Sequence, residues 1–378
     1  MNRFAKTACL ALCTATLGAF AQAPDLGQVP PYKKQLDVTG GLRVAGSELK
    51  GVMDKLIEGF AKVQPGMKAS SNYMTSSEGA LGMLFSGASD VAPMGDDAKI
   101  TDQMPFFNAK GYVPTEVSIA TGGYNMRGIL FAWAVFVNKD NPLAQLSMEQ
   151  LDGIFGSERS GGWEIGANAE NNLLYTAKYA RGPEKNIRTW GQLGLAGDWA
   201  GKEIKTFGYN APGFTVSFQR MVMHWSDKWN PNYQQFVEWK EATNDAAGDA
   251  VRSQRMYERV SRDKHAIGWG ALMHIQGTCV NPDGTKCPGY PNLKVLAISR
   301  DGGPAVPLTA DNVANRSYPL TRDAYIYVDK PPGRAMDPKV REFLRFVLSR
   351  DGQEIIQKNG PYTAIPAAYI QEQLKKLD

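Results

Sequence analysis

The chain has 378 residues and carries 42 lysine and arginine residues against 38 aspartate and glutamate residues, a formal net charge of +4. Charges this evenly balanced exclude an electrostatic argument for binding to nucleic acid or to a membrane surface. The length exceeds what one hydrophobic core comfortably organises, so two domains are expected.

Residues 1–21 have the pattern of an export signal. Arg3 and Lys6 give a basic start, an apolar run covers 8–17, and Ala19 and Ala21 form a small-x-small cleavage site. The apolar run is too short to span a membrane, and no later apolar segment of the sequence is long enough. We therefore expect a signal peptide that is cleaved after Ala21.

Helices and strands alternate in the first half of the remaining chain. Val52, Leu56 and Phe60 fall on one face of an amphipathic helix, which a Pro-Gly pair ends. The elements predicted in this half are helices over 50–63 and about 79–85 and strands over 91–94 and 129–137, the last with the longest β pattern.

The second half continues the alternation. Ser147 and Gln150 form a capping box for a helix that runs through Phe155. The Gly- and Asn-rich stretch 156–172 is predicted as a loop. Further elements are strands over 266–269 and 325–328 and a final helix that starts at Asp337 and Pro338. This order predicts an α/β protein with mainly parallel sheets.

Two cysteines remain once the signal peptide is removed. Cys279 and Cys287 flank seven residues that include the turn formers Asn-Pro and Asp-Gly. In an exported protein this pattern indicates a structural disulfide rather than a metal pair or a redox centre.

Three loops join a predicted strand to a predicted helix and carry small hydroxyl or glycine residues. They cover 45–48, 75–79 and 208–215. The start of a helix presents unpaired N–H groups and the positive end of the helix dipole, which suits an anionic ligand. Three such loops predict a cleft that closes on a small solute.

The sequence lacks the usual motifs of catalysis. Its histidines are His224, His265 and His274, with no His-x-x-x-His pair, and it contains no Walker A loop, dinucleotide fingerprint or Gly-x-Ser-x-Gly. We expect no enzyme activity, no cofactor and no metal.

Five stretches of the chain carry the motifs of one family. They are 134–142, 146–155, 189–194, 266–269 and, most specific, 318–353, which begins Tyr-Pro-Leu-Thr-Arg. Over most of its length after the signal peptide, the chain resembles the phosphate-binding proteins of phosphate ABC transporters, within the type II periplasmic binding proteins.

The resemblance implies two α/β lobes with mixed sheets, joined by two hinge strands. The first lobe would comprise 35–136 plus 318–378, and the second would comprise 137–317. Hinge closure would trap a small solute between the lobes and present it to an ABC permease in the periplasm. We expect a monomer without enzyme activity.

The family's site, carried onto this sequence, falls on the three loops and on a fourth position after residue 94. In the family, hydroxyls and helix-start amides surround the oxyanion and an arginine supplies positive charge. The candidate ligand-binding residues are Ser47, Glu48, Ser76, Ser77, Asp96, Tyr209, Asn210, Gly213 and Thr215.

The chain departs from this pattern in charge. Tyr209 stands where the family has an arginine, and Gly95 and Asp96 stand where near relatives have Ser-Arg. Carboxylates this close to a phosphate repel it unless a cation offsets them. The candidate cations are Arg127, Arg181 and Lys205, and phosphate loses its support if none of these lies near the loops.

Several alternatives stay open from sequence. Ser47 and Ser77 also fit simple helix N-caps, Asn210 and Thr215 fit a stabilised turn, and Asp96, like Glu78, fits a solvated acid at a helix start. The ligand could be another oxyanion or a neutral or cationic solute. The runner-up function is a sensor or scaffold protein of the same fold with a different ligand or none.

Overall fold

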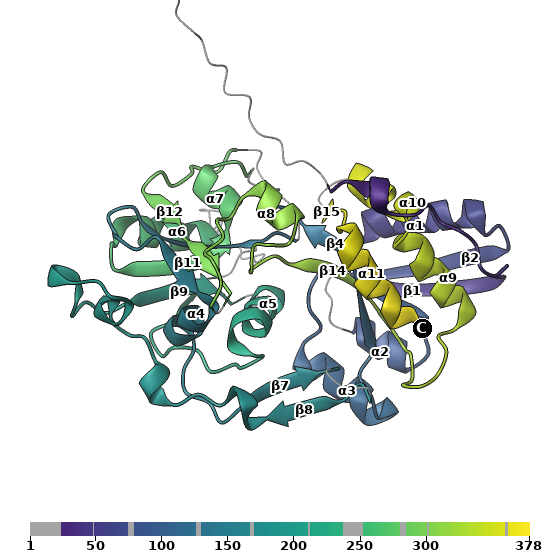
Figure 1. Ribbon diagram of the computed structural model, residues 1–378, viewed down its shortest axis with the longest axis horizontal. Coiled ribbons are helices and arrows are strands. Elements are labelled where there is room, and N and C mark those ends of the chain that lie inside the picture. Colours follow the sequence, from purple (N-terminus) through teal and green to yellow (C-terminus); the bar gives the residue numbers. More distant parts are fainter. Residues whose placement is uncertain are drawn as a thin grey trace, which may run out of the picture.

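The computed structural model describes 24–47, 49–74, 79–125, 130–166, 170–210, 212–236, 252–279, 285–300, 302–359 and 362–378. The predicted signal peptide, 1–21, lies outside these residues. Figure 1 shows two lobes side by side, each built on its own β-sheet. We name them the six-stranded lobe and the five-stranded lobe after these sheets.

The six-stranded lobe contains both the first and the last elements of the chain. Its strands, in spatial order, are β15 (Tyr362–Thr363), β4 (Thr115–Gly122), β14 (Asp323–Val328), β3 (Val91–Met94), β1 (Gly40–Ser47) and β2 (Met67–Met74). Strands β1, β2 and β3 are parallel, whereas β14 runs antiparallel to both β3 and β4. The sheet is therefore mixed.

Successive residues of a strand point to opposite faces of the sheet. Both faces of this sheet therefore carry side chains, and helices cover both. In β14, Ile326 packs in the main core of the lobe, whereas Tyr325 and Tyr327 pack in a smaller cluster on the other face. The elements on the main core are η1 (Leu26–Gln28), α1 (Lys50–Val63), α9 (Pro338–Val347), α10 (Arg350–Lys358), α11 (Ala367–Leu374) and η6 (Lys375–Leu377), and those on the other face are α2 (Ala80–Phe85) and α3 (Ile100–Lys110).

The five-stranded lobe holds the middle of the chain. Its strands, in spatial order, are β10 (Gln234–Phe236), β9 (Lys205–Tyr209), β11 (Ala266–Ala271), β5 (Trp133–Asn138) and β12 (Leu293–Val295). Its helices are α4 (Met148–Phe155), η2 (Ala177–Tyr179), η3 (Pro183–Lys185), η4 (Trp190–Leu193), η5 (Gly197–Trp199), α5 (Pro212–Met223), α6 (Arg252–Arg262), α7 (Leu272–Gln276) and α8 (Ala310–Ala314). The core is strongly aromatic, with Trp133 and Trp269 in edge contact at 4.9 Å.

Two short sheets complete the architecture. β6 (Gln145–Ser147) pairs with β13 (Ala297–Ser299), and β7 (Gly162–Ile165) pairs with β8 (Leu173–Thr176) as a hairpin. Figure 1 shows this hairpin extending from the five-stranded lobe below α5 towards α3 of the other lobe.

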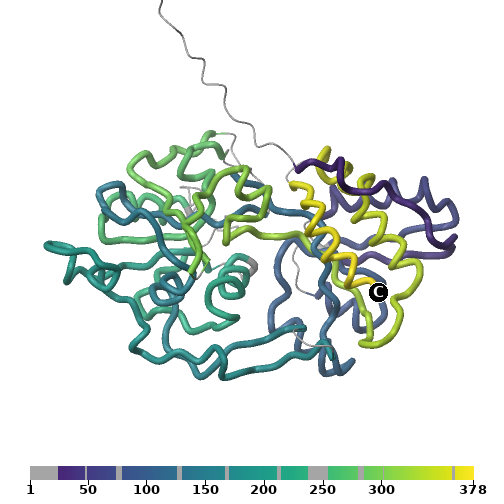
Figure 2. The backbone as a smooth tube through the Cα atoms, in the orientation of Figure 1, coloured from purple at the N-terminus to yellow at the C-terminus, as the bar shows by residue number. Residues whose placement is uncertain are grey.

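The chain crosses between the lobes twice, first between β4 and β5 and later just before β14 (Figure 2). The two crossing segments are hydrogen-bonded to each other. The Trp133 N–H donates to the Leu320 carbonyl at 3.0 Å, and the Gly122 N–H donates to the Arg322 carbonyl at 2.8 Å. Residues 320–322 therefore lie at the junction on which any hinge motion must act.

Most elements predicted from sequence are confirmed. Helix α1 has the predicted bounds, the Ser147–Gln150 capping box precedes α4, and Asp337 caps α9. The predicted disulfide joins Cys279 to Cys287. Among the residues that the structure describes, no helix is both long and apolar enough to cross a membrane.

Three predictions of local structure were wrong. The strand expected over 129–137 begins at Trp133, because Leu130, Phe131 and Ala132 are buried in a crossing segment rather than in the five-stranded sheet. The loop expected over 156–172 contains β7, whose Trp163 packs on Tyr175 of β8 at 5.3 Å. Helix α9 is followed by α10, which Ser349 caps, and by α11, so it is not the final helix.

The expectation of mainly parallel sheets also needs correction, because both main sheets are mixed. In each sheet, a strand that follows a crossing segment runs against its neighbours. β14 is antiparallel to β3, and β5 is antiparallel to β11. Alternation of helices and strands along the sequence carries no information about this reversal.

Candidate functional site

Three of the expected site loops leave one edge of the six-stranded sheet. Strands β1 and β2 are in register from Gly40 opposite Met67 to Ser47 opposite Met74, and β3 pairs in parallel beside β1. Because the carboxyl ends of parallel strands share one edge, the segments after β1, β2 and β3 begin there together. Ligands in α/β folds bind at such edges.

Gly46 shows how closely β1 and β3 approach near this edge. A Cβ atom at Gly46 would lie 2.1 Å from the Pro93 carbonyl oxygen and 2.6 Å from the Pro93 ring. Any larger residue would push the two strand ends apart. The glycine therefore serves strand packing at the base of the predicted first loop.

Only part of the expected first and second loops is described. Ser47 is the last residue of β1 and thus stands at the shared edge. Glu48, Ser76 and Ser77, together with Glu78, lie outside the described residues. Their expected roles remain predictions.

Asp96 follows β3 and forms an ion pair with Arg322. Asp96 is 9% exposed, and the Arg322 side chain is 1% exposed. The guanidinium carbon of Arg322 lies 4.6 Å from the ring centre of Trp133 and 5.5 Å from that of Phe214. A carboxylate and two aromatic faces thus hold this arginine in place.

Arg322 keeps unused hydrogen-bonding capacity. Its Nη2 donates to Asp96, whereas its Nε and Nη1 are buried and have no hydrogen-bond partner within the described part of the chain. A buried charged donor without a partner is costly, so such a group calls for an explanation.

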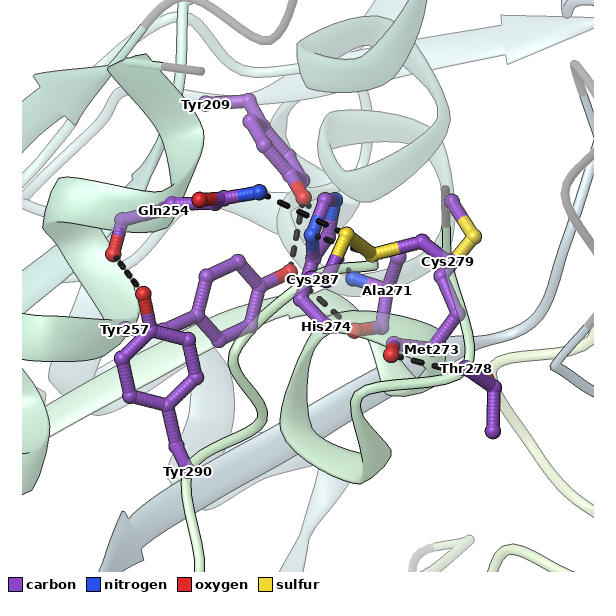
Figure 3. Close-up of a disulfide and its surroundings, with 10 residues drawn as sticks. All are labelled: Tyr209, Gln254, Tyr257, Ala271, Met273, His274, Thr278, Cys279, Cys287 and Tyr290. Atoms are coloured by element: carbon purple, nitrogen blue, oxygen red, sulfur yellow. Dashed lines mark hydrogen bonds between the residues drawn. A yellow bond between two sulfur atoms is a disulfide. The ribbon is translucent and has the colours of Figure 1, made fainter. Parts of the chain in front are cut away.

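The fourth expected loop lies at the end of β9, and its residues point in different directions. The Tyr209 side chain is fully buried in the core, where its hydroxyl lies 2.8 Å from that of Tyr257, near the disulfide (Figure 3). Asn210 is exposed, and its N–H donates to the Phe236 carbonyl at 3.1 Å. Gly213 and Thr215 belong to the first turns of α5.

Helix α5 brings the two lobes into contact. Near its start, Phe214 packs on Trp133 and faces the guanidinium of Arg322. Further along, Arg220 reaches the six-stranded lobe and forms ion pairs with Asp97 and Glu116. The beginning of α5 therefore faces the strand edge at which Asp96 lies.

We call the group of Arg220, Asp97 and Glu116 the Arg220 clamp. Both terminal nitrogens of Arg220 donate to Glu116 at 2.8 Å, and Nη1 also donates to Asp97. Burial alone would lower the pKa of Arg220, but the facing carboxylates raise it well above its ordinary value. Burial would likewise raise the pKa of Glu116, yet Arg220 outweighs that effect and lowers it.

Of the three cations that the sequence offered as partners for an anion, Arg181 and Lys205 form their contacts away from these loops. Arg181 donates to the carbonyls of Ser157, Gly153 and Lys185 and to the side chain of Asn186. Lys205 pairs with Asp263 at the opposite end of β9 from Tyr209, a span of roughly 13 Å along a strand. Arg127 lies outside the described residues.

The cation at the edge, Arg322, was missed from sequence. It lies in the Tyr-Pro-Leu-Thr-Arg motif of 318–322, which served in the sequence analysis as a marker of the family and not as part of the site. The sequence did contain one signal for this residue. Arg322 directly precedes the apolar strand β14, and an arginine in such a position must either form an ion pair or bind a ligand. Its pairing with Asp96, 226 residues away, is a long-range contact that no local pattern reveals.

One cluster has the composition of a metal site. Donor atoms of His274, Cys279 and Cys287 lie within 4.8 Å of one another. The two sulfur atoms are joined as a disulfide, so neither is the thiolate that binds zinc. Figure 3 shows His274 beside this disulfide. The distance from its Nδ1 to the sulfur of Cys279 is 3.2 Å.

Comparison with known proteins gives a consistent family match. The profile of the PBP superfamily domain matches residues 21–351. The phosphate-binding protein PstS of Pseudomonas aeruginosa is 29% identical over 353 residues, which cover 92% of this chain and 90% of that protein. PstS of Staphylococcus haemolyticus is 22% identical over 363 residues, covering 96% and 92% of the two chains.

Among solved structures, PstS from Borrelia burgdorferi is 17% identical, with 86% of this chain and 99% of that chain covered and a TM-score of 0.47. The family assignment rests on the profile match, which spans most of the sequence.

Proposed function

We propose, from the premise that this chain belongs to the PBP superfamily, that it is the solute-binding protein of an ABC transporter and binds phosphate or a related tetrahedral oxyanion. Its relatives in P. aeruginosa and S. haemolyticus are named phosphate-binding proteins, which supports phosphate as the first ligand to test. The protein binds a small molecule and is not an enzyme.

One observation carries the choice of an anion. The carboxyl ends of β1, β2 and β3 converge at one sheet edge, and the start of α5 from the other lobe faces this edge across Arg322. Helix starts and arginine side chains both favour negative charge. The acidic replacement at Asp96, which argued against phosphate, is offset because Asp96 is paired with Arg322.

The proposed ligand site takes its members from both lobes. It comprises Ser47, Glu48, Ser76, Ser77 and Asp96 on the six-stranded side and Asn210, Gly213 and Thr215 at the start of α5. Tyr209 supports, from the core, the loop that precedes α5, because its hydroxyl is hydrogen-bonded to that of Tyr257. The lobes would correspond to 35–136 plus 318–378 and to 137–317, except that β5 belongs to the five-stranded sheet, so we propose that the first boundary falls before Trp133.

The remaining features follow from the same proposal. Hinge closure at the two crossing segments would trap the solute, and the closed form of the protein would be presented to a permease. Export to the periplasm with removal of residues 1–21, and a monomeric state in solution, belong to this proposal as well.

Calorimetric titration of the purified protein with inorganic phosphate, sulfate and a neutral sugar tests the function. We expect saturable binding of phosphate with one site per chain and no response to the sugar. Thermal unfolding should show the linked stabilisation, about 2.7 kcal/mol at a phosphate concentration 100-fold above Kd. A flat response to every solute would contradict the proposal and favour a sensor or scaffold role.

A further inference from the structure

We infer that Arg322 is the anion-binding cation of the cleft and donates from its unused nitrogens to the bound oxyanion. The inference rests on the proposed function and adds the group that supplies the positive charge. It places this group in the hinge segment before β14 rather than on the loops where the family's arginines are expected.

The first support is that Arg322 is held rigidly. Its side chain is 1% exposed and lies against the rings of Trp133 and Phe214, at 4.6 and 5.5 Å. Asp96 accepts a hydrogen bond from Nη2. A guanidinium fixed in this way loses little side-chain entropy when an anion binds, which favours affinity.

The second support is the set of donors that remains. Nε and Nη1 lie on different edges of the guanidinium plane, and neither has a hydrogen-bond partner among the described residues. A tetrahedral oxyanion that approaches either edge would accept from at least one of them and so supply an acceptor that these buried donors lack. Its oxygens fit the fork geometry of arginine.

A purely structural role would leave a different pattern. Two arginines that serve the scaffold of the five-stranded lobe use all of their terminal nitrogens. Arg159 makes two hydrogen bonds to Asp152 and one to the Tyr179 carbonyl. Arg181 makes four hydrogen bonds through its terminal nitrogens. Arg322 has one carboxylate and two idle nitrogens, at the edge where the strand ends of one lobe face α5 of the other.

The position also explains the unusual charges of the site. Asp96 replaces an expected arginine, yet it is the residue that orients Arg322. The positive charge has therefore moved from the loop after β3 to the hinge, and the carboxylate remains as its support. An anion bound there would contact a segment whose backbone is hydrogen-bonded to both lobes.

The experiment measures phosphate affinity by calorimetry for matched variants. Arg322→Lys keeps a charge for Asp96 but loses the fork, and we expect affinity to fall about tenfold. In the double variant Asp96→Asn/Arg322→Gln, a neutral hydrogen-bonding pair replaces the ion pair, and affinity should fall about 100-fold or more. The matched control, Asp152→Asn/Arg159→Gln, makes the same change in a buried pair of the five-stranded lobe and should stay within about threefold of wild type.

A second measurement separates direct contact from support of the fold. In wild-type protein labelled with ¹⁵N-arginine, the Nε–H resonance that Arg322→Lys removes should shift when phosphate is added. Wild-type protein that binds neither phosphate nor sulfate would overturn both the proposed function and this inference. Phosphate binding with near-wild-type affinity in both Arg322 variants, or an Nε–H resonance that phosphate leaves unmoved, would overturn the inference alone.

Discussion

Arg220 and Arg322 both lie where the lobes meet, and they differ in how completely they are paired. Arg220 donates from both terminal nitrogens to Glu116 and from one of them to Asp97. Among the residues that the structure describes, Arg322 donates to Asp96 alone, although its side chain is the more buried of the two. The better-shielded charge therefore has the fewer partners.

The comparison separates two uses of the same side chain. A charge that stabilises a lobe contact should be satisfied within the protein, since an unpaired partner is costly. A charge that binds a ligand must retain donors for it. By this criterion Arg220 is a clamp between the lobes, and Arg322 is a ligand group.

Removing the clamp should produce the largest loss of stability. In Arg220→Met, Asp97 and Glu116 lose their shared cation while staying largely shielded from water, so the free energy of unfolding should fall by about 2 kcal/mol. Urea denaturation measures this change. The control is Arg43→Met, which removes an arginine that is half exposed and pairs with Asp90; it should cost less than about 1 kcal/mol. Equal losses in the two variants would mean that the clamp contributes no more than a surface ion pair.

The pH dependence of the clamp sharpens the same comparison. The pKa of Glu116 is lowered from its ordinary value of 4.5, with Arg220 opposing the effect of burial. A carboxyl group with a lowered folded pKa contributes stability that is present above its unfolded pKa and is lost as pH falls through the folded pKa. Without Arg220, burial should raise the pKa of Glu116, so the stability difference between wild type and Arg220→Met should be largest near neutral pH and shrink as the pH falls through that raised pKa. A difference that grows on acidification would show that Glu116 is not the partner that matters.

The two arginines also mark what the sequence could and could not predict. Helix α1, the capping box before α4 and the disulfide follow from local signals, namely a 3.6-residue period, a side chain three residues ahead and two cysteines around a turn. Each signal lies within one element. These local features and the family resemblance were sufficient for the two-lobed fold.

The site was harder to predict because its charges are paired over long distances in sequence. Asp96 was expected to repel an anion, but its partner lies 226 residues further along the chain. Tyr209 was expected at the ligand because it aligns with an arginine, yet its hydroxyl bonds within the core. A position in a loop motif does not determine whether the side chain points to the cleft or into the lobe.

Tyr209 gives the next prediction, which concerns the five-stranded core. Tyr209→Phe removes the hydroxyl that contacts Tyr257 and accepts from the Ala271 N–H, so stability should fall by about 1.5 kcal/mol. Phosphate affinity should not change, in contrast to the Arg322 variants. Calorimetric titration beside thermal unfolding measures both quantities. Weaker phosphate binding at full stability would instead make Tyr209 a ligand residue, as its alignment with the family's arginine suggests.

The smallest effect is expected at a second contact between the lobes, where the β7–β8 hairpin meets the six-stranded lobe. Asn171, just before β8, donates from its side chain to the Val113 carbonyl, and its own carbonyl accepts from the Val113 N–H at 2.8 Å. Its φ of 53° lies in the left-handed region, which glycine adopts without strain.

Asn171→Gly therefore removes the side-chain bond while preserving the turn, at an expected cost of about 0.5–1 kcal/mol. The hydrogen bond from the Val113 N–H to the carbonyl of residue 171 should survive. The Val113 amide should therefore exchange with deuterium only a few-fold faster than in wild type, as a cost of about 0.5–1 kcal/mol implies. Asn171→Ala keeps neither the bond nor an easy left-handed backbone and should cost more than the glycine variant. If the alanine variant were the more stable, the left-handed turn at residue 171 would not be what docks the hairpin.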